Sequence, residues 1–369
     1  MKVIVLGGAG EMAARAVEDL LTQDDVEEVV LADINRDKAA DFARQLNSSR
    51  VSVTDFDAED HEGAVQKIKG YDVACGAVGP FYRFEKKVVS ACLEAGVDYV
   101  SICDDHDAIK SVLPLDDQAR EKGVAVITGM GWTPGMSNLM ACEGFRELGN
   151  VREINVYWGG SASDSEGFAV ILHTLHIFDG VVPVFIDGNE IEVKAGSEPQ
   201  KVDFGSSLGE VFTYNVGHPE PVTLPRYLTG VQKVTLKGGL KENSLNHLTR
   251  CLASLRLTGT PRKKQVLGKI VNSSMPLLKK LGPSTGCSGI RVDVYGEKDG
   301  EKCHQVYRAV DRMKNLTGLP LAVGALMLGR GQVSRTGVFA PEAEGGISPH
   351  TFREELSSRG IHIEKKEYF

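Results

Sequence analysis

This sequence of 369 residues contains neither a long apolar run nor a paired cysteine pattern. No apolar stretch approaches the ~20 residues that a membrane-spanning helix requires, so we expect no membrane partner. The seven cysteines are odd in number and widely spaced, and no two of them form a Cys-x-x-Cys pair. This pattern excludes a disulfide framework and a thiolate zinc site, and it predicts a reducing, cytoplasmic location. The first residues lead directly into a strand pattern, so we expect no signal peptide.

Positive charge is also scarce, because 42 basic residues stand against 50 acidic ones and give a net charge of −8. A nucleic-acid-binding protein needs a concentrated basic surface, so we expect no nucleic-acid partner. The one basic stretch, Arg262 to Lys280, has apolar residues at helical spacing and is interpreted as a solvated helix face. Internal repeats and low-complexity segments are absent, and the chain length predicts two domains.

The chain begins with a strand pattern, a glycine-rich turn, a helix pattern and a second strand pattern. The apolar run Val3–Leu6 leads into the turn Gly7–Ala13, and the second apolar run ends at Asp33. Glycines let such a turn bend sharply and approach a pyrophosphate, and the helix N-terminus that follows favours anions. An acid about 20 residues further on is placed to accept hydrogen bonds from the adenosine ribose. The order predicts a dinucleotide-binding unit for NAD, with NADP still possible because Arg36 follows closely.

Strand and helix patterns alternate through the first third of the sequence, up to the apolar run Val124–Ile127. This alternation predicts an α/β fold with a doubly wound, mostly parallel Rossmann sheet. Ligands of such sheets lie beyond the carboxyl ends of the strands. The residues that we expect to contact the cofactor there are Gly7, Gly10, Glu11, Met12, Ala13, Asp33, Asp57, Ala77, Val78 and Gly79.

The pattern changes after Pro134. A helix is predicted from Met136 to Leu148, then longer strand-like stretches, an Asp187-Gly188 hairpin turn, and a small-residue helix that opens at Gly318. We therefore predict a second α+β domain with a mixed sheet. The expected boundaries are 1–135 for the dinucleotide-binding domain, 136–318 for a substrate-binding and dimerisation domain, and 319–369 for a C-terminal segment that returns to the first domain.

Two groups of polar residues follow predicted strand ends in the first domain. Tyr82 and Arg83 come after the fourth strand, and an arginine there can hold a substrate carboxylate through two parallel hydrogen bonds. An ordinary loop with a surface arginine is the alternative interpretation. Asp104 and His106 offer groups for proton transfer near the nicotinamide. One acid of the pair Asp104-Asp105 is expected to cap the next helix.

Histidines and prolines distinguish part of the second domain. His173 and His176 are three residues apart, as metal ligands sometimes are, but no acid or cysteine with matching spacing accompanies them, so no metal is expected. The segments His218–Pro221 and Thr223–Arg226 are interpreted as a rigid polar loop. Arg226 is the expected anchor for a substrate carboxylate, and an exposed arginine on a proline-braced loop is the alternative.

Several of these segments resemble the saccharopine dehydrogenase superfamily, within which the lysine 6-dehydrogenase and saccharopine reductase branch is most similar in pattern. The similarity covers nearly the whole chain, and the Thr-Pro-Gly-x-Ser-Asn element at 133–138 is its most specific part. The segments that carry the resemblance are Gly79–Phe84, Ala95–Val100 followed by Asp104, Gly131–Asn138, Ser165-Glu166-Gly167, Thr223–Arg226 and Gly337–Ala343.

The resemblance implies a Rossmann domain, a second domain whose sheet forms a homodimer interface, and a crevice between the domains for the cofactor and an amino-acid or amine substrate. It implies hydride transfer between a nicotinamide and a carbon–nitrogen bond, with Thr133, Pro134 and Asn138 lining the domain crossing. The chain departs from the family pattern at Asp104–His106 and His218–Pro221, which leaves the substrate open. A carboxynorspermidine-type reductive condensation enzyme and a non-catalytic NAD(H)-binding redox sensor are the alternative functions.

Overall fold

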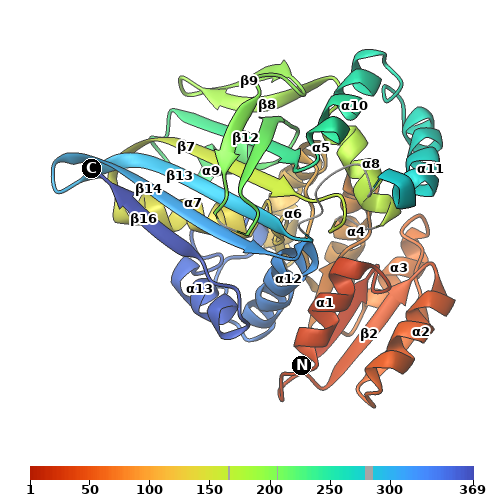
Figure 1. Ribbon diagram of the computed structural model, residues 1–369. Helices are drawn as coiled ribbons and strands as arrows, with labels where there is room; N and C mark the ends of the chain where they lie inside the picture. Colours follow the sequence, from red (N-terminus) through yellow and green to blue (C-terminus); the bar gives the residue numbers. More distant parts are fainter. Residues whose placement is uncertain (165–166, 206, 279–285) are drawn as a thin grey trace. The chain divides into compact units, whose positions relative to one another are not determined.

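The computed structural model describes residues 1–164, 167–205, 207–278 and 286–369 (Figure 1). The chain forms two compact units. The first unit contains Met1–Met136 and Thr317–Arg359, and the second contains Ser137–Leu316 and Gly360–Phe369. Four residues singled out in the sequence, Ser165, Glu166, Lys279 and Lys280, lie outside the described residues.

The first unit is built on a seven-stranded sheet in the order β15-β6-β5-β4-β1-β2-β3, and every strand pair in it is parallel. The strands are β1 (Lys2–Leu6), β2 (Glu28–Asp33), β3 (Val51–Asp55), β4 (Val73–Gly76), β5 (Asp98–Ser101), β6 (Ala125–Ile127) and β15 (Gly337–Phe339). The helices are α1 (Glu11–Leu20), α2 (Arg36–Leu46), α3 (His61–Ile68), α4 (Phe81–Ala95), α5 (His106–Val112), the 3-10 helix η1 (Leu113–Leu115), α6 (Asp116–Glu121), most of α12 (Met313–Gly329) and α13 (Pro349–Ser358). The predicted parallel Rossmann sheet is therefore confirmed.

The central strands of this sheet are continuous apolar runs because both of their faces are buried. In β4 every residue is buried, and in β1 only Lys2 is exposed. A strand that is covered on both faces needs apolar residues at every position rather than at alternate ones. This is why the sequence pattern identified these strands correctly.

One helical segment of the first unit is divided, and another helix is longer than predicted. Residues 106–121 form α5, η1 and α6 and not one continuous helix, because Pro114 lacks the N–H that a helix interior uses. Conversely, α12 begins at Met313, and Pro320 lies inside it. The apolar residues around Pro320 are buried, and their burial offsets a proline cost of about 3 kcal/mol. A Cβ on Gly318 would lie 2.5 Å from the carbonyl oxygen of Met12, so this glycine lets α12 pack closely on α1.

The second unit is built on a nine-stranded mixed sheet with the main order β10-β11-β12-β7-β13-β14-β16, while β8 pairs with β12 and β9. The β12–β7 pair is parallel and its neighbours are antiparallel, so the predicted mixed sheet is confirmed. The strands are β7 (Gly149–Gly160), β8 (Val181–Ile186), β9 (Asn189–Lys194), β10 (Gln200–Asp203), β11 (Glu210–Asn215), β12 (Lys233–Leu240), β13 (Ser288–Lys298), β14 (Glu301–Asp311) and β16 (Glu364–Tyr368). The helices are α7 (Met136–Glu147), α8 (Phe168–Ile177), α9 (Glu220–Tyr227), α10 (Asn243–Ser254) and α11 (Pro261–Leu278).

Turn chemistry was predicted correctly in one place and incorrectly in another. Asp187 and Gly188 have φ values of 52° and 75° and join β8 to β9 as the expected two-residue hairpin. The expected rigid loop at 218–226 is wrong, because residues Glu220–Tyr227 form α9. Pro221 lies in the first turn of α9, where its missing N–H costs nothing, and buried Leu224 supports the helix despite Pro225.

The end of the chain also differs from the prediction. The segment 319–369 was expected to return to the first unit, but its last ten residues belong to the second unit. There β16 pairs antiparallel with β14, with Tyr368 opposite His304. The charged sequence of β16 has too few apolar residues to indicate a strand, because its pairing is supplied by β14.

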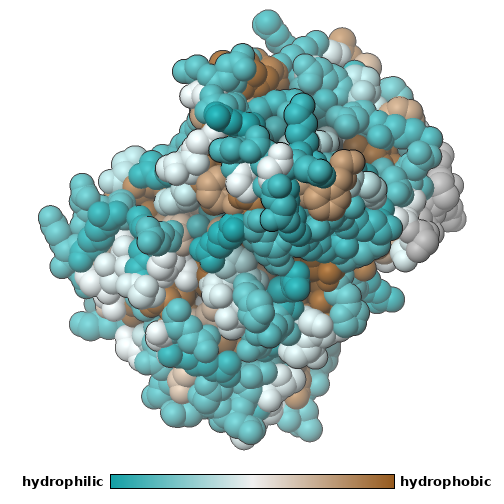
Figure 2. Space-filling model, turned by 90° about the vertical axis from the view of Figure 1, so that its left-hand side faces the viewer, coloured by the Kyte–Doolittle hydropathy of each residue, from teal (hydrophilic) through white to brown (hydrophobic). Residues whose placement is uncertain are grey.

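No helix in the described ranges is long and apolar enough to cross a membrane. On the face drawn in Figure 2, hydrophilic residues predominate, and hydrophobic residues form small separate areas.

Candidate functional site

The glycine turn between β1 and α1 is the best-defined feature of the first unit. Gly7 has a φ of +80°, and a Cβ on it would lie 2.6 Å from the carbonyl oxygen of Ala77, so only glycine fits. The N–H of Gly7 donates to the carbonyl of Ala32 at 2.8 Å, which fixes the turn on the end of β2. Gly10 is the N-cap residue of α1 and makes no side-chain cap. The first turn of α1 begins at this glycine, and backbone N–H groups at the start of a helix favour an anion such as a pyrophosphate.

Asp33 ends β2 beside this turn. One carboxylate oxygen accepts from the N–H of Ala9 at 3.0 Å, and the other accepts from the N–H of Asn35 at 2.8 Å. The side chain thus braces the glycine turn as well as placing a negative charge next to it. Asp57 lies beyond the end of the neighbouring strand β3, where it is exposed and accepts from the N–H of Glu59 at 2.9 Å.

The segment that follows β4 completes this edge of the sheet. The N–H of Ala77 donates to the carbonyl of Leu6 at 2.8 Å, and Ala77, Val78 and Gly79 are half-buried. The structure therefore brings the predicted cofactor residues together at the carboxyl ends of β1, β2 and β4. Glu11, Met12 and Ala13 form the first turn of α1 at the same place. The residues present fit a dinucleotide.

Arg83, the predicted substrate anchor of the first unit, already has an acidic neighbour. Its Nη2 lies 2.7 Å from Oε1 of Glu59, and its guanidinium carbon lies 4.7 Å from the centroid of the Phe84 ring. Hydrogen bonds from Lys87 and Arg83 lower the pKa of Glu59. A substrate carboxylate would have to replace Glu59 at this arginine. Tyr82 is half-buried, and burial raises the pKa of its phenol.

The acids after β5 have different surroundings from one another. Asp105 is fully buried and stands at the N-cap position of α5, but its carboxylate makes no cap there. It accepts from the N–H of Tyr82 at 2.9 Å, so it caps α4 and ties the starts of two helices together. The side chain of Asp105 therefore caps α4 and not the next helix, α5. Asp104 and His106 are half-buried at the same strand end, and their catalytic role stays a prediction.

Glu85 is a buried acid that sequence reasoning missed. Its carboxylate is 1% exposed and accepts hydrogen bonds from Tyr99 at 2.9 Å, Ser101 at 2.6 Å and Thr128 at 3.0 Å. Burial raises its pKa to about 7 despite these three donors. The signal in the sequence is that Glu85 shares the apolar face of α4 with buried Phe81, where a charged residue is unexpected.

The second unit contains a buried polar network that sequence reasoning also missed. The Nε2 atoms of His173 and His218 are 3.3 Å apart, so one ring must donate and the other accept. His218 is 3% exposed, and its Nδ1 lies 4.0 Å from Oε2 of the fully buried Glu220. The other oxygen of Glu220 accepts from the hydroxyl of Ser137 at 2.7 Å. We call Ser137, His173, His218 and Glu220 the histidine network.

The remaining predicted residues divide between the two units. Asn138 donates from Nδ2 to the hydroxyl of Thr223 at 3.0 Å, three residues before Arg226 on α9. Arg226 is exposed, with its guanidinium carbon 6.0 Å from the centroid of the Tyr227 ring. Thr133 and Pro134 are buried and belong to the first unit.

The two histidines that share α8 have different partners. His176 contacts the ammonium of Lys264 through Nδ1 at 2.8 Å, whereas His173 contacts His218. The sequence spacing of the pair therefore reflects two separate interactions.

Comparison with known proteins connects the first unit to a family. Residues 3–127 match the family described as the saccharopine dehydrogenase NADP binding domain. The chain is 21% identical over 393 residues to Carboxyaminopropylagmatine dehydrogenase of Synechocystis sp., covering 98% of this chain and 96% of that protein. It is 27% identical over 139 residues to the Lipid droplet localized protein of Caenorhabditis elegans, covering 35% of this chain and 33% of that protein.

Solved structures connect the whole chain to the same fold. The apo saccharopine dehydrogenase (L-Glu forming) of Saccharomyces cerevisiae superposes with a TM-score of 0.72 at 15% identity and covers 100% of both chains. Residues 3–127 are therefore similar to the saccharopine dehydrogenase NADP binding domain, and the chain has the fold of a saccharopine dehydrogenase.

Proposed function

We propose that this protein is an NAD(P)-dependent oxidoreductase that oxidises a carbon–nitrogen bond of an amino acid or amine to an imine, or reduces that imine. The observation that carries the proposal is the glycine turn between β1 and α1, within residues that match an NADP binding domain. The similarity to two dehydrogenases named for nitrogen-containing substrates supports the choice of bond.

In this proposal the first unit holds the cofactor. Gly7, Gly10 and the first turn of α1 bind the pyrophosphate, Asp33 accepts from the adenosine ribose, and Val78 and Gly79 border the nicotinamide ribose. A carboxylate at position 33 repels a 2′-phosphate, so we propose that NAD is preferred over NADP. The bound nicotinamide supplies the hydride acceptor or donor.

The proton chemistry requires a base, because an amine must be neutral before its carbon can lose hydride. We assign this role to the histidine network. Of two neutral imidazoles whose Nε2 atoms lie 3.3 Å apart, the ring that donates across this contact keeps an unprotonated Nδ1, which can accept a proton. As hydride leaves the carbon, the nitrogen lone pair forms the C=N bond, and the N–H proton passes to an imidazole. Glu220 stabilises the positive charge that then develops on His218.

A second candidate function is the reductive joining of an aldehyde to a polyamine. It is favoured by the similarity over 98% of this chain to a dehydrogenase named for a substituted agmatine. In that reaction the same groups act in the reverse direction: an imidazolium donates the proton to nitrogen while hydride arrives at carbon.

A turnover assay with the purified full chain tests the proposal. NAD⁺ or NADP⁺ is mixed with saccharopine, lysine or a carboxyalkyl-substituted polyamine, and the absorbance of reduced nicotinamide is followed. We expect an amine-dependent rise. Activity only with an aldehyde, a diamine and NAD(P)H would establish the second candidate. Tight NADH binding without turnover on either panel would instead identify a redox sensor, and no affinity for either coenzyme in calorimetry would refute the assignment.

A further inference from the structure

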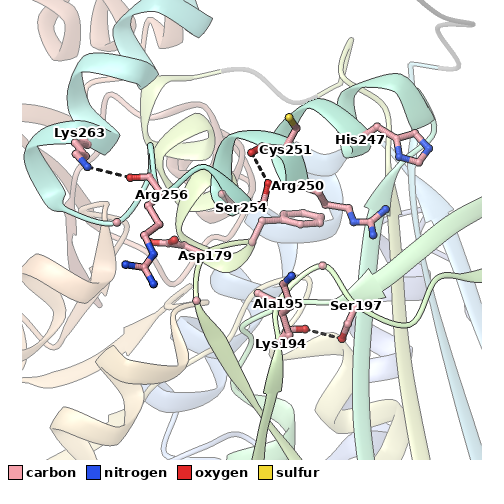
Figure 3. Close-up of a pocket in the computed structure, with 15 residues that line it drawn as sticks. Asp179, Lys194, Ala195, Ser197, His247, Arg250, Cys251, Ser254, Arg256 and Lys263 are labelled. Carbon is pink, nitrogen blue, oxygen red and sulfur yellow. Dashed lines mark hydrogen bonds between the residues drawn. The ribbon is translucent and has the colours of Figure 1, made fainter.

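The second unit contains a pocket of about 1060 Å³ whose charged lining residues are mainly basic (Figure 3). Its walls come from the end of α8, the segment after β9, the helix α10 and the start of α11. We propose that this pocket binds a small polyanion, that is, a molecule with several phosphate or carboxylate groups. The proposal is independent of the dinucleotide site, because every lining residue belongs to the second unit.

The charges around the pocket do not balance. Lys194, Arg250, Arg256 and Lys263 line it, and Asp179 is the one carboxylate among the described lining residues. That carboxylate is already occupied: Oδ1 accepts from the hydroxyl of Thr258 at 2.9 Å, and Oδ2 lies 3.3 Å from the ammonium of Lys264. Four cations around one concavity repel each other unless an anion lies between them. This clustering is notable in a chain whose net charge is −8.

Arg250 is held in place before any ligand arrives. Its guanidinium carbon lies 4.5 Å from the centroid of the buried Tyr214 ring. Its aliphatic part packs on Gly196, where an added Cβ would lie 2.9 Å from Cγ of Arg250. Gly196 also has a φ of +70°, so both its conformation and its lack of a side chain serve this packing. A guanidinium that is stacked in this way loses little rotamer freedom when it binds an anion.

Arg256 occupies a position that favours glycine. It follows the C-cap residue Leu255 of α10 with a φ of 54°, and the N–H of Leu257 donates to the carbonyl of Leu252 at 3.1 Å, which closes the helix end. A residue other than glycine is strained in this conformation. The ammonium of Lys263 donates to the carbonyl of Arg256 at 3.0 Å, which keeps two cations at the same rim (Figure 3).

Interactions with helix dipoles do not by themselves explain why four cationic side chains surround this pocket. Arg250 and Arg256 lie near the C-terminal end of α10, where positive charge is favourable. Lys263, however, lies in the first turn of α11, which contains no acidic residue, and positive charge is unfavourable at a helix N-terminus. Lys194 ends the strand β9 and has no helix to stabilise. An anion in the pocket would compensate all four charges and would also complement the N-terminus of α11.

Calorimetry on the full chain tests this site, with pyrophosphate and citrate as two probes of similar charge. The titrations are made without coenzyme and again with NAD at saturation, so that probe binding in the dinucleotide site is recognised by its loss. We expect Lys194→Gln and Arg250→Gln each to weaken binding about tenfold, and the double variant to weaken it about a hundredfold. Lys302→Gln, an exposed lysine on β14 of the same unit, is the matched control and should bind like the wild type. The probe that binds more tightly shows whether the pocket prefers a ligand with phosphate groups or one with carboxylate groups.

Three results would contradict the proposal that this pocket binds a polyanion. They are equal affinity in Lys194→Gln and in the control, pyrophosphate and citrate binding that both disappear when NAD is present, and no binding of either probe. Because Lys194 is exposed, its substitution leaves the fold intact even if Arg250→Gln unfolds the unit. If the chain binds neither NAD nor NADP, the proposed function fails, but the comparison of Lys194→Gln with its control still tests the pocket.

Discussion

The two units form their candidate sites in different ways. The first unit uses backbone: a glycine turn and a helix N-terminus that come from seven consecutive residues, Gly7–Ala13. The second unit uses side chains: its histidine network joins Ser137, His173, His218 and Glu220 from three helices and the residues before α9. The comparison shows that a site made of backbone is encoded locally, whereas a site made of side chains is encoded only through the fold.

Glu85 and Glu220 are buried glutamates of the first and second unit, and their carboxylates are held differently. Glu85 of the first unit is surrounded by three hydroxyl groups, which stabilise it without adding charge. Glu220 of the second unit faces an imidazole, which can become positive. The first arrangement suits a structural acid, and the second suits one that responds to proton transfer.

The largest expected effect concerns the backbone site. Gly7→Ala should weaken NAD(P) binding more than about a hundredfold, because the new Cβ would lie 2.6 Å from the carbonyl oxygen of Ala77 and displace the turn. Calorimetry with both coenzymes measures this loss.

Gly70→Ala is the matched control for that substitution. Gly70 has a φ of +90°, but an added Cβ there would have nothing within 4 Å. It should lower stability by about 1 kcal/mol and leave cofactor affinity unchanged. If the two variants bound the coenzymes equally well, the turn would not be the cofactor site.

The second prediction concerns the side-chain site. His173→Gln should lower kcat about a hundredfold with little change in KM, because glutamine can keep the contact with His218 but cannot take a proton. The pH profile of kcat should lose one limb. His106→Gln is the comparison in the first unit, and a larger loss of kcat in this variant would return the proton chemistry to Asp104 and His106.

The contrast between a local site and one formed by distant residues also explains which parts of the fold and of the candidate sites could be predicted from the sequence. The parallel sheet, the glycine turn and the Asp187-Gly188 hairpin were predicted because each depends on neighbouring residues. The histidine network was not, because residues 137 and 220 meet only when α7 and α9 pack in the same unit. The helix α9 was missed because Pro221 and Pro225 indicate a loop, while the burial of Leu224 that outweighs them is a tertiary effect.

The third prediction concerns Glu85 and the pH dependence of stability. The pKa of this glutamate is about 7 in the folded chain, against an ordinary value of 4.5. Between these values the folded state binds the proton more tightly, so this group's contribution is present in full below about pH 4.5 and is lost as the pH rises to about 7. The loss is about 3 kcal/mol.

Denaturant unfolding of the wild type and of Glu85→Gln at several pH values measures that contribution. The neutral amide can still accept from Ser101 and Thr128 through Oε1 and can donate to the Tyr99 oxygen, but it does not titrate. The stability of the variant relative to the wild type should therefore improve as the pH rises from 4.5 to 7. Parallel curves for the two proteins would show that Glu85 does not change its protonation in this range.

The smallest expected effect separates two roles of Asp33. Its carboxylate braces the glycine turn through Ala9, and loss of this brace would weaken NAD and NADP equally. If it also binds the adenosine ribose, Asp33→Ala should weaken NAD about tenfold and NADP less, because the 2′-phosphate is no longer repelled. The ratio of the two dissociation constants is therefore more informative than either value. An unchanged ratio would restrict Asp33 to supporting the turn, and the preference between the coenzymes would then depend on other residues, such as Arg36 at the start of α2.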